Sequence, residues 1–215
     1  MEIVRDWIYG ECAASGRQRS SLVAVLECLL RYGGTPVGQA KVAREAGLGN
    51  NTVAAGYLEL LTDLMCITPT YVWDASRGVK LRRKPCKFPF CNTLAALAWH
   101  PAQLRTVADF NALPAATKGV WYEWAVAQEL WRRSAIDNEP LPEEKIFWQS
   151  KEHELDFVLP PKTFLGVKHG QATPLEFAWF HRIFPTERLT VISSSRFKTD
   201  QIQTMSLEEF LLERE

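Results

Sequence analysis

The chain has 215 residues, 47% of them hydrophobic, and its 25 Lys and Arg balance 25 Asp and Glu. This composition is typical of a globular protein with one large domain or two small ones around a buried core. No apolar run reaches the ~18 residues that a membrane span needs, and no basic-then-apolar leader precedes Trp7. We therefore expect a cytoplasmic protein that has no membrane partner.

Charge is unevenly distributed along the chain. From Met1 to Ala95 there are 12 Lys and Arg against 8 Asp and Glu, whereas the remainder carries 13 against 17. The basic N-terminal part is therefore the better candidate for contact with nucleic acid. The five cysteines are an odd number, and Cys86 and Cys91 lack the second close pair of a zinc site. We expect reduced, mostly buried thiols.

Apolar spacing predicts a helix-turn-helix after a connector, residues 1–19. A first helix opens at Ser20 or Ser21 and ends at Gly33-Gly34. A second runs from Thr35-Pro36 to about Ala46, and after the turn Gly47-Leu48-Gly49 a third begins at Asn50 or Asn51. The apolar positions of the first and third helices are Leu22, Val25, Leu26, Leu29 and Leu30, then Val53, Tyr57, Leu60, Leu61 and Leu64.

Two strand-like runs, Cys66 to Trp73 and Val79 to Arg83, flank a glycine-containing turn and predict a wing. Residues 20–95 would then form a winged helix, whose third helix can enter the major groove of DNA. Its start can accept a phosphate, and the basic run after it suits contacts with the DNA backbone. The candidate DNA contacts are Asn50, Asn51, Thr52, Arg77, Lys80, Arg82, Arg83, Lys84 and Lys87.

Residues Ala54, Ala55 and Gly56 of the third helix are poor readers of base edges, which argues against sharp sequence specificity. A winged helix that contacts only protein, with the basic run as a solvated surface, is the alternative interpretation. The two interpretations differ in whether affinity for DNA falls steeply with salt.

The segment 144–171 predicts three strands. Lys145–Gln149 and Leu155–Leu159 form a hairpin, and Thr163–Lys168 follows after Pro160-Pro161-Lys162 has stopped the second strand. Side chains alternate across a strand, so Glu154, Asp156 and Val158 would share one face. Phe164, Gly166 and Lys168 would share one face of the next strand. Asp156 and Lys168 could therefore meet, and the plainest interpretation is a cross-strand ion pair worth roughly 0.2 to 1 kcal/mol.

A helix from Gly119 to about Arg133 precedes these strands, with Glu123 able to point inward at the sheet and Glu129 expected at the surface. Thr173-Pro174 caps a second helix to about Phe184, and a fourth strand follows. A capping box at Ser206 and Glu209 opens a last helix. The order helix, three strands, helix, strand predicts an α/β domain with a mixed sheet over residues 96–215.

The segments Leu155-Asp156-Phe157-Val158 and Gly166-Val167-Lys168 resemble the PD-(D/E)xK nuclease superfamily. The resemblance implies a restriction-endonuclease-like fold in which Asp156 and Lys168 are catalytic and Mg²⁺ is the cofactor. Gly166 occupies the position of the second metal-binding acid. Glu123, from the preceding helix, or Glu154 could supply the missing metal ligand.

Nearly the whole chain also resembles a narrower family, the C-terminal region of bacterial and archaeal AAA+ type ATPases that bears a domain of unknown function. The stretches that carry this resemblance are Asp6-Trp7-Ile8-Tyr9-Gly10, Asn51-Thr52-Val53 with Tyr57-Leu58, Gly119 with Glu123, and Leu155-Asp156-Phe157. It implies a winged helix before a nuclease-like fold, and an ATPase domain or chain as partner. No GxxxxGK[ST] loop is present in this sequence, so no ATP site is expected here. Met1 would then begin either a fragment of a longer protein or a lone C-terminal half.

The function that these residues and the two resemblances imply is a DNA-binding, nuclease-like accessory module of an AAA+ ATPase-type protein, whose catalytic site is degenerate at Gly166. One alternative is an active Mg²⁺-dependent DNA endonuclease that uses a displaced carboxylate. A second alternative is a protein adaptor that binds no DNA.

Overall fold

The computed structural model describes residues 1–136, 145–159 and 163–213, and its contacts divide the chain into two units. Unit 1 comprises Met1–Thr70 and Arg83–Leu113, and unit 2 comprises Tyr71–Arg82 and Pro114–Glu215. These limits differ from the predicted ones. A boundary after Ala95 would cut the helix α5 (Thr93–Trp99), which belongs to unit 1.

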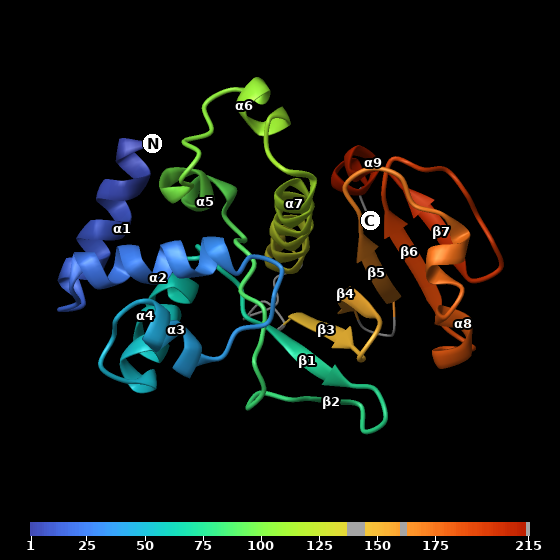
Figure 1. The fold of residues 1–215 in the computed structure, drawn as a ribbon, viewed down its shortest axis with the longest axis horizontal. Helices are drawn as coiled ribbons and strands as arrows, with labels where there is room; N and C mark the ends of the chain where they lie inside the picture. Colours follow the sequence, from blue (N-terminus) through green and yellow to red (C-terminus); the bar gives the residue numbers. More distant parts are fainter. Residues whose placement is uncertain (137–144, 160–162, 214–215) are drawn as a thin grey trace. The chain divides into compact units, whose positions relative to one another are not determined.

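Unit 1 is helical (Figure 1). Besides α5 it contains α1 (Glu2–Ala14), α2 (Arg19–Arg31), α3 (Gln39–Glu45), α4 (Asn51–Asp63) and α6 (Val107–Asn111). The connector predicted for residues 1–19 is therefore wrong, because most of it is α1. Val4, Ile8 and Cys12 recur every four residues, and Ile8 and Cys12 are buried where α1 packs against α2 and α5.

The predicted helix-turn-helix segment forms α2, α3 and α4. Helix α4 begins where expected, because the Asn50 side chain accepts a hydrogen bond from the Val53 N–H at 2.9 Å and caps the helix. Helix α3 begins later than predicted, because Val37 forms an antiparallel bridge with Cys86 before the chain can turn helical. Bridges Ile67 to Phe90 and Thr70 to Lys87 extend this short pairing within unit 1.

Unit 2 is built on a mixed sheet, as predicted. Within the described residues, seven strands lie in the order β2-β1-β3-β4-β5-β6-β7. Strands β3, β4 and β5 pair antiparallel, whereas β5, β6 and β7 pair parallel. The strands are β1 (Thr70–Asp74), β2 (Val79–Lys80), β3 (Lys145–Gln149), β4 (Glu154–Leu159), β5 (Thr163–Val167), β6 (Arg188–Ile192) and β7 (Ile202–Met205).

Strands β1 and β2 form the predicted hairpin, but they do not form a free wing. Asp74 accepts hydrogen bonds from the backbone N–H groups of Ser76 and Arg77, and Gly78 has a φ of +67°, which closes the turn. The hairpin Tyr71–Arg82 belongs by its contacts to unit 2, where β1 lies next to β3 at the edge of the sheet. A wing would instead have stayed with the helices of unit 1.

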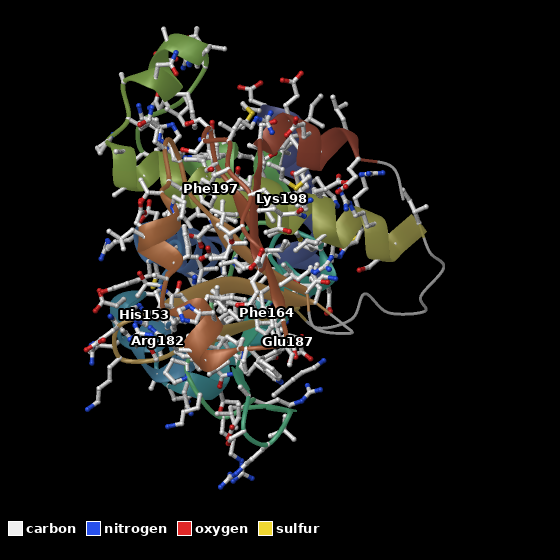
Figure 2. The ribbon with its side chains drawn as sticks, turned by 90° about the vertical axis from the view of Figure 1, so that its right-hand side faces the viewer. His153, Phe164, Arg182, Glu187, Phe197 and Lys198 are labelled. Atoms are coloured by element: carbon white, nitrogen blue, oxygen red, sulfur yellow. The ribbon has the colours of Figure 1, made fainter. Side chains whose placement is uncertain are left out.

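Helices cover both faces of the unit 2 sheet (Figure 1). On one face α7 (Ala115–Ile136) and α9 (Leu207–Leu212) bury Val126, Leu130 and Phe210 against the strands. On the other face the short helices η1 (Pro174–Phe177) and α8 (Phe180–Ile183) bury an aromatic core around Phe164, which Figure 2 labels. The pair replaces the single longer helix predicted from Thr173, and β7 was not predicted.

The break predicted at Pro160-Pro161-Lys162 lies outside the described residues. The five cysteines are all buried and unpaired, as expected, and burial raises the pKa of Cys66, Cys86 and Cys91 to about 12. In the parts of the chain that the structure describes, every helix is too short or too polar to cross a lipid bilayer.

Candidate functional site

The first predicted site is the N-terminal half of α4. Asn50, Asn51, Thr52 and Val53 are exposed, whereas Ala54 behind them is buried in the core of unit 1. Because Asn50 uses its side-chain oxygen to cap the helix, Asn51 and Thr52 are the polar side chains that this end of α4 offers to a ligand.

The predicted basic run is divided between the two units. Arg77, Lys80 and Arg82 belong to the hairpin of unit 2, and Arg83 and Lys84 are exposed residues of unit 1. Two of these cations already interact with neighbouring side chains. Arg77 forms an ion pair with Asp74 at 3.8 Å, and the Arg82 guanidinium lies over the Tyr71 ring at 5.7 Å.

Lys87 is wrong as a DNA contact. Its side chain is 4% exposed, and its backbone exchanges both hydrogen bonds with Thr70 in the short pairing of unit 1. A buried residue cannot reach a phosphate, so Lys87 has a structural role.

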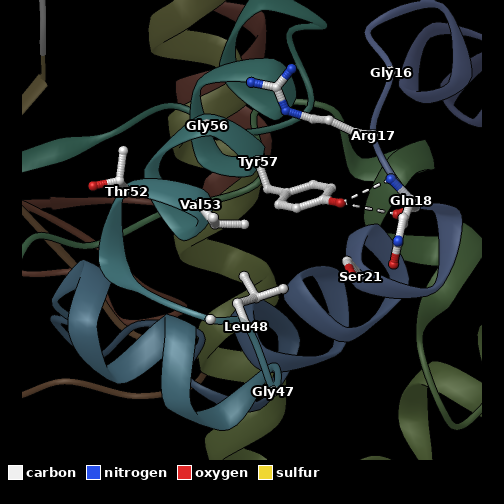
Figure 3. A pocket seen from close by; sticks show the side chains of 11 residues that line it. Gly16, Arg17, Gln18, Ser21, Gly47, Leu48, Thr52, Val53, Gly56 and Tyr57 are labelled. Atoms are coloured by element: carbon white, nitrogen blue, oxygen red, sulfur yellow. Dashed lines mark hydrogen bonds between the residues drawn. The ribbon is translucent and has the colours of Figure 1, made fainter.

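The sequence did not predict a cavity of about 580 Å³ between the α1–α2 loop, the α3–α4 turn and α4 (Figure 3). The Arg17 side chain reaches from the loop across Gly56 on α4, and Figure 3 shows it beside the Tyr57 ring. A glycine in the middle of a helix destabilises the helix by about 1 kcal/mol relative to alanine. The presence of Gly56 in α4 was therefore the one feature of the sequence that could have indicated this cavity.

The second predicted site lies at the start of β4, where a β-bulge changes the direction of the side chains. Ile146 pairs with Val158 and Trp148 with Leu155, so β4 has one more residue than β3 over this interval. Leu155 and Val158 consequently enter the same aromatic core. The predicted common face of Glu154, Asp156 and Val158 is therefore wrong, because strict alternation does not hold across a bulge.

The bulge also frees Asp156 to bond the neighbouring strand. Its carboxylate oxygen Oδ2 accepts a 2.7 Å hydrogen bond from the backbone N–H of Val167 on β5. In a regular antiparallel pair a backbone carbonyl of β4 would accept this N–H. Asp156 thus fastens β4 to β5, and part of its capacity as an acceptor is used within the sheet.

Gly166 and Lys168 are directed to the face that carries η1. A Cβ at Gly166 would lie 3.6 Å from the Phe177 ring and 4.0 Å from Leu189 and Val191, all of them in the aromatic core. Val167 packs on the opposite face with α7, and His169 contacts the Tyr122 ring of α7 at 4.8 Å. Alternation therefore directs the exposed Lys168 away from α7.

Glu123 is half-buried on α7, and Glu154 is half-buried at the first position of β4. Among the described residues, no three His, Cys, Asp or Glu side chains lie close enough together to hold a metal ion. Glu123, Glu154 and Asp156 are thus not gathered into one cluster. With Gly166 facing an apolar core, these described residues do not fit a Mg²⁺ site.

Among the described residues of unit 2, Glu129 is the buried carboxylate, although it was expected at the surface. It receives hydrogen bonds from Arg132 at 2.6 and 2.7 Å and from Arg133 at 2.8 Å. The hydrogen bonds from Arg132, followed by those from Arg133, lower the pKa of Glu129 below its ordinary value. The group is structural, because the Arg133 guanidinium continues to the Phe210 ring and carbonyl of α9.

Comparison of the chain with protein-family models, with curated proteins and with solved structures gives no match.

Proposed function

We propose that this chain is a DNA-binding module that contacts DNA through α4 of unit 1, and that the nuclease-like sheet of unit 2 is an accessory without an efficient catalytic site. The observation that carries the proposal is the arrangement of α3, the short turn and α4, with the N-terminal half of α4 exposed. The bridges among Val37, Cys86 and the segments 67–70 and 87–90 give unit 1 the short strand pairing of a winged helix, although the predicted wing itself, β1 and β2, belongs to unit 2.

The order of elements in unit 2 supports the nuclease-like part of the proposal. A helix, three antiparallel strands, a helical segment and a parallel strand follow one another, and Asp156 lies at a bulge, a feature that is frequent beside active sites. The direction of Gly166 and the dispersed acids support a site that does not cut efficiently. An ATPase domain or chain as partner belongs to the same proposal.

Thr52→Glu tests the contact through α4. Thr52 is the second residue of α4, so the new carboxylate suits the helix dipole and should leave stability unchanged. Like charges 4 Å apart repel by about 1 to 4 kcal/mol, so the affinity for a labelled duplex in fluorescence anisotropy should fall about tenfold or more.

Ala116→Glu is the matched control, because Ala116 is exposed and is also the second residue of a helix, α7. It should leave the affinity unchanged. Two results would contradict the proposal: absence of DNA binding by the native chain at low salt, or an equal loss of DNA affinity in both variants. The first result would leave the protein adaptor as the explanation.

The alternative of an active endonuclease is favoured by one observation, the placement of Asp156 at the bulge with its 2.7 Å bond to Val167. We expect no cleavage of linear or branched DNA by the native chain with Mg²⁺ or Mn²⁺. Gel analysis of the native chain beside Asp156→Asn and Lys168→Ala checks this. Metal-dependent cutting that both substitutions abolish would establish the endonuclease instead.

A further inference from the structure

The exposed face of α4 contains no cation of its own. Its sequence has neither Lys nor Arg, and its two charged residues, Glu59 and Asp63, are both acidic and exposed. A helix that approaches DNA with this face meets the repulsion of the phosphates. A cationic side chain must therefore reach the face from another element.

Arg17 occupies this position. It belongs to the loop between α1 and α2, and its guanidinium lies so close to Gly56 that a Cβ there would be 2.7 Å from Nη2. The central carbon of this guanidinium, Cζ, lies 5.8 Å from the centre of the Tyr57 ring. Any residue other than glycine at position 56 would displace the charge from the surface of α4.

Hydrogen bonds of Tyr57 fix the loop that carries Arg17 (Figure 3). The buried Tyr57 hydroxyl accepts from the Gln18 N–H at 3.0 Å and donates to the Gln18 carbonyl at 3.3 Å. Both bonds join α4 to the residue immediately after Arg17. The backbone of this loop is therefore fixed beside α4 before any ligand arrives, which reduces the entropy lost when Arg17 binds one.

We propose that Arg17, held over Gly56 in the cavity beside α4, binds a phosphate of the DNA backbone. A planar guanidinium pairs with phosphate through two parallel hydrogen bonds, and the open cavity leaves room for the phosphate oxygens. The proposal rests on the proposed function, because it names the cation that α4 needs in order to approach DNA.

Gly56→Ala tests the placement of Arg17 without changing any charge. The added methyl group displaces the flexible end of Arg17. The affinity for DNA should therefore fall about tenfold, which is the effect expected when one hydrogen bond to a charged group is lost. Gly10→Ala in α1 is the control, because a Cβ there meets nothing within 4 Å. Both variants should keep the native melting temperature or exceed it, since alanine favours helix.

Arg17→Gln removes the charge itself. In fluorescence anisotropy over a range of salt, the slope of log affinity against log salt should become shallower by about 1, for AT-rich and GC-rich duplexes alike. Native affinity in both Gly56→Ala and Arg17→Gln would overturn this inference and leave the proposed function intact. A loss confined to one duplex would also overturn it, by assigning Arg17 to a base. No binding by the native chain would overturn the proposed function as well.

Discussion

Replacing Glu129 by alanine should destabilise unit 2 by about 3 kcal/mol, because breaking a buried ion pair leaves its partner charge uncompensated. Glu129 is 5% exposed, and the side chain of Arg133 is 17% exposed. Arg132 can turn to water, since half of its side chain is exposed, whereas Arg133 is held against Phe210. Urea unfolding followed by tryptophan fluorescence checks this, because six of the eight tryptophans lie in unit 2.

The pH dependence of this effect has a definite sign. The pKa of Glu129 is lowered from its ordinary value of 4.5, chiefly by the hydrogen bonds from Arg132. The stabilisation is therefore fully present above pH 4.5 and is lost as the pH falls through the lowered pKa. Arg132→Gln, which removes the more exposed partner, should destabilise unit 2 much less than Glu129→Ala does. This account would be contradicted if the two substitutions reduced the unfolding free energy equally. It would also be contradicted if the difference between native and Glu129→Ala stability grew as the pH falls.

Gly166→Glu should not restore a nuclease site. The new side chain would start 3.6 Å from the Phe177 ring in the aromatic core, so its carboxylate would lose hydration without gaining a partner. We expect a loss of unfolding free energy on the order of 3 to 5 kcal/mol. Because the burial would raise the pKa of the new acid, the loss should become smaller as the pH falls toward 4.

Gly166→Ala is the control for the glycine itself. Its Cβ meets only ordinary van der Waals contacts, and Gly166 is not among the glycines with positive φ. It should be neutral or stabilise by about 0.5 kcal/mol. Native stability together with Mg²⁺-dependent cleavage in Gly166→Glu would contradict the orientation described for this position and would show a site disabled at one residue.

Local signals in the sequence were sufficient to predict several of the helices. The apolar spacing of α2, the Asn50 cap of α4 and the capping box of α9 act within a few residues, so each could be identified from sequence. The later start of α3 could not, because it depends on the pairing of Val37 with the distant Cys86. Long-range pairing overrides local preference in such cases.

The candidate sites were harder to predict than the helices, because they depend more on contacts between residues that are far apart in the sequence. The bulge in β4 appears only when the register against β3 is known, and the direction of Gly166 becomes meaningful only beside Phe177 from η1. Arg17 and Gly56 are far apart in the chain, and the sequence offered only an unexplained mid-helix glycine. Glu129 was predicted at the surface, whereas in the structure it is buried and paired with Arg132 and Arg133.

The assignment of the β1–β2 hairpin to unit 2 bears on how such a protein can evolve. The chain leaves unit 1 after Thr70, returns at Arg83 and leaves it again after Leu113, so neither unit is encoded by a continuous stretch of the gene. A single junction cannot transfer one unit without also carrying part of the other, because the β1–β2 hairpin of unit 2 lies between the two stretches of unit 1. The two units are therefore expected to be inherited together and to diverge as a pair.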